Sequence, residues 1–211
     1  DVLEQDGQQF VRVVDYKSGA KAFRLADIVN GLNLQMFLYL FNVCADGSNP
    51  YAGVPAGVLY MHAARNVMTV ETKSSAEKDI AGQEDKAFGM NGIVITNPDC
   101  DIPAAMEHDL AGKYIPVRLK KSGVGGSLAS LEQLGLLQRK IEALVADMGN
   151  ALQNGQIGQH PVQAKDHDKT CEYCDFASVC AFKKSVTPRT YDDQTDSAVL
   201  AELEKEGESH A

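Results

Sequence analysis

The sequence contains no long apolar run. Its longest apolar stretch, at residues 36–44, is far shorter than the roughly 20 residues that a membrane-spanning helix needs. Positive charge is also scarce, because the formal net charge is −9 at pH 7. This balance argues against a protein that grips nucleic acid over its whole surface, although a local basic cluster is compatible with it. No internal repeat is visible.

A phosphate-binding loop is missing as well. The glycine cluster Gly123-x-Gly125-Gly126 is not followed by the Lys-Ser/Thr pair of such loops. No helicase motor motif is visible either. ATP hydrolysis by this chain is therefore not expected, and a parent complex that hydrolyses ATP would do so elsewhere.

The chain does contain the material for one folded core. With 211 residues, 44% hydrophobic and 23% charged, it has the composition of an ordinary globular protein. Strand-like and helix-like segments alternate, which predicts a mixed α/β fold with a central mixed sheet flanked by helices. The expected elements are a hairpin over 1–16 that turns at Asp6-Gly7, strands at 58–61, 67–70 and 92–96, a helix over 33–43 and a long helix over 128–152. Residues 121–126 are expected to form a mobile glycine-rich loop.

Four polar residues near the start of the chain form the strongest functional pattern. Asp15 and Lys17 end an apolar strand, and because strand side chains alternate, both point to the same face. Gln35 and Tyr39 stand four residues apart in the predicted helix, so they also share a face. A carboxylate, an ammonium, an amide and a phenol together suit a metal ion and a phosphodiester. Asp-x-Lys alone is more often a solvated turn, but the ordered combination favours a nuclease site.

The chemistry assigns a role to each of these residues. Mg²⁺ prefers carboxylate and water oxygens, so Asp15 is a candidate ligand. The cation would neutralise charge on the scissile phosphate and acidify a bound water, while Lys17 orients that water or stabilises the developing charge. Gln35 is expected to hold the water or a phosphate oxygen, and Tyr39 to donate to the phosphate. A local basic cluster beside the site is formed by Lys17, Lys21 and Arg24.

Three cysteines near the C-terminus form a second pattern. Cys171, Cys174 and Cys180 have the spacing Cys-x2-Cys-x5-Cys, which in a chain of intracellular character favours a metal or an iron–sulfur cluster over disulfides. Thiolates suit zinc and iron–sulfur clusters alike, and a cubane cluster takes four. Zinc held together with His167, or less readily with His160, is the competing interpretation.

The first pattern resembles a known nuclease family. The segments Val-Val-Asp-Tyr-Lys-Ser-Gly at 13–19 and Leu-Gln-Met-Phe-Leu-Tyr at 34–39 are similar to the RecB-type branch of the PD-(D/E)xK nuclease superfamily. This resemblance implies a restriction-endonuclease-like core. It also implies that Asp15 is the second Mg²⁺ ligand, that Lys17 is the catalytic lysine, and that the supporting third motif consists of Gln35 and Tyr39.

One part of the family's pattern is not matched inside the chain. The first acidic motif of the family reads Gly-Arg-Ile-Asp-Arg-x-Asp, and its earlier Asp is the metal ligand. Asp1 corresponds to the later Asp, so the resemblance places the first ligand, and a histidine still further upstream, before this chain. We therefore expect the chain to hold half of a metal site and to show little DNA cleavage by itself.

The cysteine pattern narrows the resemblance. A Cys-x2-Cys-x5-Cys segment followed by Phe, downstream of a RecB-type core, is similar to the C-terminal end of the AddB family of helicase–nuclease subunits. The resemblance implies Mg²⁺-dependent exonucleolytic cleavage of DNA in double-strand break repair by homologous recombination, with an AddA-like helicase–nuclease subunit as partner and a cytoplasmic location. It also implies that Cys171, Cys174 and Cys180 join one cysteine far upstream to hold a 4Fe-4S cluster. Cys44 and Cys100 match no ligand position and are interpreted as structural.

The motifs predict three parts: a nuclease core at 1–165, a cluster-binding cysteine segment at 166–184 and an acidic, weakly ordered tail at 185–211. Two alternatives remain open. A Cas4-like iron–sulfur exonuclease is complete in one chain and carries its own first Asp and fourth Cys. A non-catalytic scaffold module would have a vestigial Asp-x-Lys and structural zinc, so its metal content separates it from the nucleases.

Overall fold

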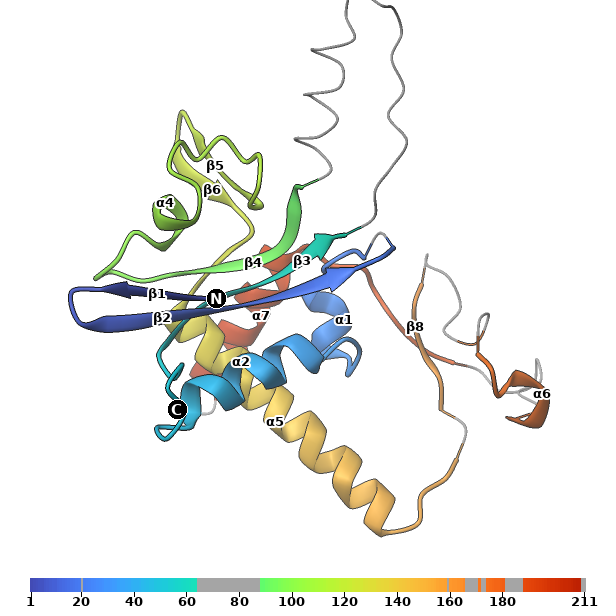
Figure 1. The fold of residues 1–211 in the computed structure, drawn as a ribbon. Coiled ribbons are helices and arrows are strands. Elements are labelled where there is room, and N and C mark those ends of the chain that lie inside the picture. Colours follow the sequence, from blue (N-terminus) through green and yellow to red (C-terminus); the bar gives the residue numbers. More distant parts are fainter. Residues whose placement is uncertain are drawn as a thin grey trace, which may run out of the picture. The chain divides into compact units, whose positions relative to one another are not determined.

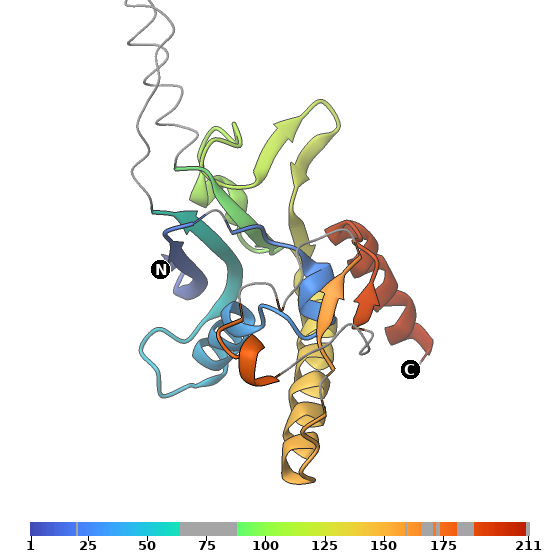
Figure 2. The same cartoon turned by 90° about the vertical axis from the view of Figure 1, so that its right-hand side faces the viewer.

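The structure is a computed structural model that describes residues 1–19, 21–63, 88–158, 160–165, 171, 174–180 and 188–209. The chain forms two compact units, whose elements are drawn in Figures 1 and 2. Unit 1 comprises Asp1–Phe23 and Gln35–Gly135, and unit 2 comprises Arg24–Leu34 and Leu136–Ala211. The strand predicted at 67–70 and the candidate ligand His167 lie outside the described residues.

Unit 1 is built on a five-stranded sheet with the strand order β1-β2-β3-β4-β7. The pairs β1–β2 and β3–β4 are antiparallel, whereas β2–β3 and β4–β7 are parallel. The predicted α/β class with a central mixed sheet is therefore confirmed. The strands are β1 (Val2–Gln5), β2 (Gln8–Lys17), β3 (Val54–His62), β4 (Met90–Thr96) and β7 (Leu128–Ser130).

The first two strands form the hairpin that the sequence predicts. Asp6 has φ 53° and Gly7 has φ 77°, the left-handed pair that a two-residue hairpin turn of type I′ requires. The register places Val2 opposite Val11 and Leu3 opposite Phe10. β1 is the exposed edge of the sheet, and the hairpin turn thus determines which β1 residues lie beside the functional strand β2.

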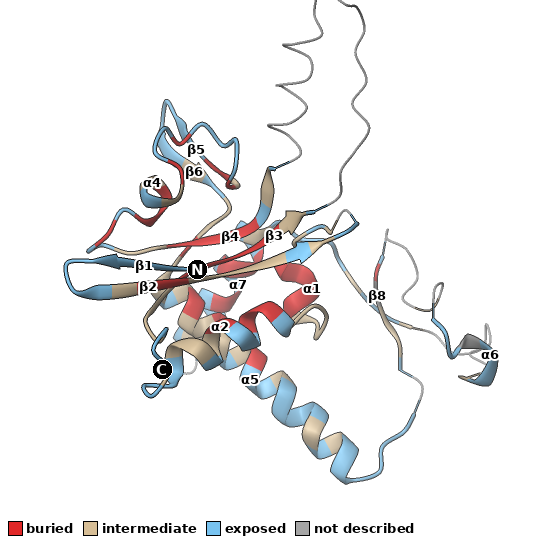
Figure 3. Cartoon of the chain, in the orientation of Figure 1, coloured by how far each residue is buried: buried red, intermediate tan, exposed pale blue. Residues whose placement is uncertain are grey.

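Different elements cover the two faces of this sheet (Figure 1). α2 (Gln35–Ala45) packs on β2 and β3 and buries Met36, Phe37 and Leu40. On the other face lie α4 (Ile102–Met106) and the hairpin of β5 (Val117–Lys120) and β6 (Gly123–Gly126). Figure 3 shows buried residues along β3 and β4 and within α2 and α4. The core on the α4 side consists of Phe10, Ala56, Leu59, Val94, Cys100, Ile102, Leu110, Ile115 and Val117.

Two helices begin later than the sequence predicts. Asn33 has a left-handed φ of 55°, so it cannot start the helix there, and α2 begins at Gln35. The long helix α5 (Leu131–Gln153) begins after a reciprocal cap, in which the Ser130 N–H donates to Gln133 and the Gln133 N–H donates to the Ser130 hydroxyl, at 2.9 and 3.1 Å. Residues 128–130 instead complete the sheet as β7.

The glycine-rich stretch at 121–126 was predicted to be a mobile loop, and this prediction is wrong. Residues Gly123–Gly126 form β6, which pairs with β5 in a two-stranded sheet. At Gly126 the backbone has φ 140°, and a Cβ at this position would collide with the carbonyl oxygen of Pro116. The glycine content therefore reflects close backbone approach within a hairpin.

Unit 2 contains α1 (Leu25–Val29), most of α5, β8 (Val162–Ala164), α6 (Ala177–Cys180), β9 (Arg189–Tyr191) and α7 (Asp196–Ser209). The strands β8 and β9 form a parallel pair. The expectation of a weakly ordered tail fails at α7, because the side chains of Val199, Leu200 and Leu203 share one helix face and are buried. The predicted boundaries at 165 and 184 follow motifs, not compact units, and they stay predictions.

A buried polar cluster holds unit 2 together. The Asp27 carboxylate accepts hydrogen bonds from Arg24 Nη2 at 3.1 Å, from Asn33 Nδ2 at 3.1 Å and from the Tyr191 hydroxyl at 2.6 Å. Burial and the Asp27 carboxylate both raise the pKa of Tyr191, so this phenol stays protonated and keeps its hydrogen bond. No helix in the described part of the chain is long and apolar enough to span a membrane.

Candidate active site

Asp15 and Lys17 lie together near the C-terminal end of β2. Lys17 Nζ is 2.6 Å from Asp15 Oδ2, and both side chains are partly exposed. The hydrogen bond to Asp15 raises the pKa of Lys17 above its ordinary value of 10.5, and the nearby Tyr60 and Tyr39 act in the same direction. The lysine is therefore a permanent cation beside a carboxylate that solvent can reach.

Gln35 and Tyr39 form a second pair on the first turns of α2. Gln35 Nε2 donates to the Tyr39 hydroxyl at 2.7 Å, and both side chains are exposed. Tyr39 is close enough to Lys17 to influence its pKa. The structure thus places Tyr39 within electrostatic reach of the Asp15–Lys17 pair, on the sheet face that α2 covers.

An aromatic floor beneath the site was not predicted from the sequence. Tyr60 lies across from Asp15 in the parallel β2–β3 register, and Lys17 Nζ is 5.9 Å from the centre of its ring. Phe23 contacts both Tyr60 and Phe37, with ring centroids 6.4 and 6.2 Å apart. The signal was hidden because it depends on which residue of β3 pairs with Asp15, a long-range register.

The basic cluster predicted beside the site is smaller than its sequence suggests. The guanidinium of Arg24 is bound to the buried Asp27 carboxylate of unit 2, with Nη2 3.1 Å from Oδ2. This pairing gives Arg24 a structural role in unit 2. Lys17 remains as the cation that contacts Asp15.

Asp1 cannot serve as a metal ligand beside Asp15. Its carboxylate is 2.9 Å from Arg12 Nη2, and both residues line a cavity with Ile102 and Met106 on the α4 side of the sheet. Asp15 faces the other side, with Lys17 and α2. Asp1 instead closes the hairpin, since its amino group and carbonyl both hydrogen-bond the backbone of Arg12 at 3.0 Å.

The cysteine segment lies in unit 2. Cys171, Cys174 and Cys180 form no disulfide; Cys174 is exposed and the other two are half-buried. The Cys174 N–H approaches the Cys171 carbonyl at 3.4 Å, and Cys180 ends α6. Among the residues that the structure describes, no group of three or more His, Cys, Asp or Glu side chains is arranged to hold a metal. The three thiols nevertheless have the donor chemistry of an iron–sulfur or zinc site.

The two remaining cysteines fit the structural interpretation. Cys100 is buried beneath the sheet, and its Sγ lies 3.1 Å from Gln5 Oε1. Burial raises the pKa of both Cys44 and Cys100, so their thiols stay protonated at neutral pH and are poor nucleophiles or metal ligands.

Comparison with known proteins agrees with this geometry. A profile described as PD-(D/E)XK nuclease superfamily matches residues 1–181. A Bacillus cereus protein, named as the B-type subunit of an ATP-dependent helicase/deoxyribonuclease, is 32% identical over 219 residues, which cover 98% of this chain and 18% of the relative. A protein of the same name from Oceanobacillus iheyensis is 32% identical over 222 residues, covering 100% of this chain and 19% of the relative.

The chain thus spans about a fifth of the length of these relatives. The resemblance to AddB-type subunits, predicted from the Asp-x-Lys and cysteine patterns, is confirmed. Because the profile covers most of its residues, the chain belongs to the PD-(D/E)XK nuclease superfamily.

Proposed function

We propose that this chain is the nuclease part of an AddB-like helicase–nuclease subunit, which degrades DNA exonucleolytically with Mg²⁺. We further propose that it acts with an AddA-like helicase–nuclease partner in the repair of double-strand breaks by homologous recombination. The observation that carries the proposal is the joining of Asp15, Lys17 and Tyr39 on one face of the sheet. The names of the relatives, which include both helicase and deoxyribonuclease, support the wider assignment.

The residues of the site fit one Mg²⁺ ligand set in part. Asp15 offers a solvent-accessible carboxylate, the oxygen donor that Mg²⁺ prefers. When bound, the ion would supply charge neutralisation at the scissile phosphate and an acidified water. Lys17, kept protonated by its surroundings, stabilises negative charge that develops on the phosphate.

The helix residues position the substrate. The Tyr39 hydroxyl accepts from Gln35, which leaves the phenolic proton of Tyr39 available for a phosphate oxygen. Gln35 in turn holds the phenol in place. Tyr60 and Phe23 form a rigid apolar base under Lys17, so the ammonium is directed towards Asp15 and the solvent side.

The β1–β2 register supports a position for the second acidic ligand. Asp1 pairs with Arg12 across the hairpin, so a residue three positions before Asp1, in a continued antiparallel strand, would lie opposite Asp15. In the Asp-Arg-x-Asp motif of the family, the metal-binding Asp stands three residues before the Asp that Asp1 matches. Directly opposed residues of antiparallel strands have Cα atoms about 4.5–5.5 Å apart, close enough for two carboxylates to share a cation.

The test uses a hybrid in which this chain replaces the matched region of the Bacillus cereus relative. We expect the hybrid to degrade end-labelled linear DNA in Mg²⁺ but not in EDTA, and to leave covalently closed circular DNA intact. Asp15→Asn and Lys17→Ala should each lower the rate by at least about 100-fold, as expected when a metal ligand or charge-stabilising group is lost. The matched controls Asp109→Asn and Lys205→Ala alter exposed side chains and should retain full activity.

Full activity of the Asp15→Asn and Lys17→Ala hybrids would contradict the site assignment. Rapid cutting of circular DNA would contradict the exonuclease mode. The chain by itself is expected to cleave at a rate far below that of the hybrid, because it contributes Asp15 as its only carboxylate in contact with Lys17 among the described residues.

A further inference from the structure

The hairpin of β5 and β6 carries a local positive charge that is unusual for this chain. Residues 110–131 contain four basic residues and no Asp or Glu, although the whole chain has a formal net charge of −9. The four are Lys113, Arg118, Lys120 and Lys121. The active-site chemistry described above uses none of them.

The register of the hairpin sorts its side chains onto two different faces. Arg118 pairs with Gly125 and Lys120 pairs with Gly123, so both cations share one face with two glycines. A Cβ built on Gly125 would touch the Lys120 side chain at 3.4 Å, which shows that Lys120 lies across bare backbone. No bulky side chain stands between the cations, and a flat group such as a phosphate backbone can approach closely.

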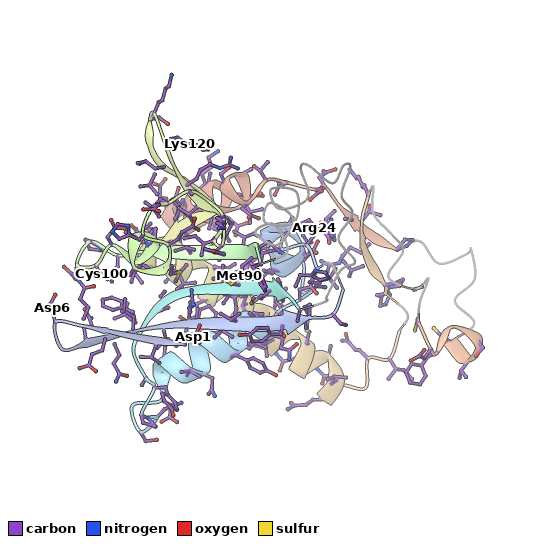
Figure 4. All side chains as sticks on the ribbon, turned by 45° about the horizontal axis from the view of Figure 1, so that its top comes forward. Asp1, Asp6, Arg24, Met90, Cys100 and Lys120 are labelled. Carbon is purple, nitrogen blue, oxygen red and sulfur yellow. The ribbon has the colours of Figure 1, made fainter. Side chains whose placement is uncertain are left out.

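The opposite face of the hairpin is apolar at its free end. Leu119 is 64% exposed and Val124 is 45% exposed, and the two are cross-strand partners. Figure 4 shows Lys120 near the free end of the hairpin. Within the described part of the chain, Arg118, Lys120 and Lys121 have no hydrogen-bond or ion-pair partner, and all three are exposed.

The base of the hairpin is firmly anchored. The buried Glu107 carboxylate accepts hydrogen bonds from the backbone N–H groups of Lys113, Tyr114 and Ile115, at 2.9, 3.0 and 3.1 Å. Ile115 and Val117 are buried in the core on the α4 side. The cations are therefore presented by a fixed strand pair, not by a loose loop, which lowers the entropy lost when they bind a ligand.

We infer that the β5–β6 hairpin is a second DNA-contacting element, which binds the sugar–phosphate backbone through Arg118, Lys120 and Lys121. Charge complementarity selects DNA as the occupant, because an exposed cationic face without acidic neighbours suits a polyanion. The inference rests on the proposed function for the identity of the ligand. The hairpin lies on the sheet face opposite α2 (Figure 1), so it contributes affinity and not chemistry.

The test measures DNA binding by the 211-residue chain in EDTA, where no cleavage can occur. Fluorescence anisotropy of labelled single-stranded and duplex oligonucleotides of mixed sequence gives Kd as a function of salt. For the double variant Arg118→Gln/Lys120→Gln we expect weaker binding, and the slope of log K against log salt should fall by about 0.9 per lost contact on duplex DNA or about 0.7 on single strands.

The matched control is Arg139→Gln/Lys205→Gln, which removes the same two residue types from exposed helix positions. It should leave Kd and slope unchanged. An unchanged slope in the hairpin variant, an equal loss in the control, or no salt-dependent binding by the parent chain would each overturn the inference.

The outcome is separable from that of the proposed function. If the hybrid cleaves DNA and Asp15→Asn abolishes cleavage while the hairpin variant binds normally, the hairpin inference alone fails. If no hybrid cleaves DNA but the hairpin variant loses salt-dependent binding, the DNA contact stands and the nuclease assignment fails.

Discussion

At the scale of single residues, three carboxylates of this chain are placed in three different environments. Asp15 is partly exposed and contacts one cation, Lys17, so its oxygens retain capacity for a metal. Glu107 and Asp27 are buried, and their oxygens are occupied by N–H and O–H donors. This contrast explains why, of these three, Asp15 is the candidate metal ligand, whereas the other two organise the backbone around them.

Glu107 yields a prediction about pH. Burial alone raises the pKa of Glu107, but the backbone N–H groups of Lys113, Ile115 and Tyr114 outweigh it, so the pKa lies below the ordinary value of 4.5. A depressed pKa means that this carboxylate stabilises the fold fully above pH 4.5 and loses that contribution as the pH falls through its folded pKa. We expect Glu107→Gln to lower the free energy of unfolding by about 1.5–3 kcal/mol at neutral pH.

Urea denaturation of both proteins at a series of pH values measures this effect. The difference between wild type and Glu107→Gln should shrink as the pH falls below 4.5, because the wild-type carboxylate is then neutral too. Glu132→Gln, at an exposed position, is the control and should have little effect. A constant difference at every pH would show that the carboxylate charge is not what holds the loop.

At the scale of elements, α7 shows that an acidic composition does not prevent a segment from packing. Leu203 is 6% exposed, whereas Leu152 at the end of α5 is 75% exposed. Leu203→Ala should therefore lower the free energy of unfolding by about 2–5 kcal/mol through lost burial and a residual cavity. Leu152→Ala, the same chemical change at an exposed helix position, should change it by less than about 0.5 kcal/mol.

Thermal or urea unfolding of the two variants distinguishes these expectations. Equal stability of Leu203→Ala and Leu152→Ala would mean that α7 contributes no buried face. It would also restore the weakly ordered tail that composition predicts.

Local patterns were readable from the sequence, and long-range pairings were not. The Asp6-Gly7 turn and the shared face of Asp15 and Lys17 depend on neighbouring residues, and both appear in the structure as predicted. The strand order β1-β2-β3-β4-β7 depends on pairings between distant segments. For the same reason Tyr60 was missed, since its place across from Asp15 follows from the parallel β2–β3 register.

At the scale of the whole molecule, the two units are interleaved in sequence. The chain leaves unit 1 after Phe23, contributes Arg24–Leu34 to unit 2, and returns to unit 1 at Gln35, where α2 and the third motif begin. Within unit 2, Leu25 N–H donates to Asp196 at 2.9 Å, and Arg189 donates to the Asn30 carbonyl at 2.9 Å. The segment that precedes Gln35 is therefore held by residues that follow the cysteines.

This connectivity gives the cysteine segment a structural meaning. Residues 165–188 connect β8 to β9, and β9 carries Tyr191, whose hydroxyl binds Asp27. A cluster that binds Cys171, Cys174 and Cys180 would draw together the chain between the two strands. We propose that it stabilises unit 2 and, through the shared chain, the start of α2.

The corresponding prediction concerns metal content. The hybrid, purified without oxygen, should contain iron and acid-labile sulfide, and Cys171→Ser, Cys174→Ser and Cys180→Ser should each lose most of both, because each removes a thiolate ligand. Cys44→Ser, which changes a half-buried thiol outside the motif, should retain them. Loss of the cluster should also lower the unfolding temperature, since metal binding to the folded state alone is folding free energy. One zinc per chain without sulfide, lost on His167→Ala, would instead support the zinc-binding scaffold, and iron retained in all three cysteine variants would contradict the ligand assignment.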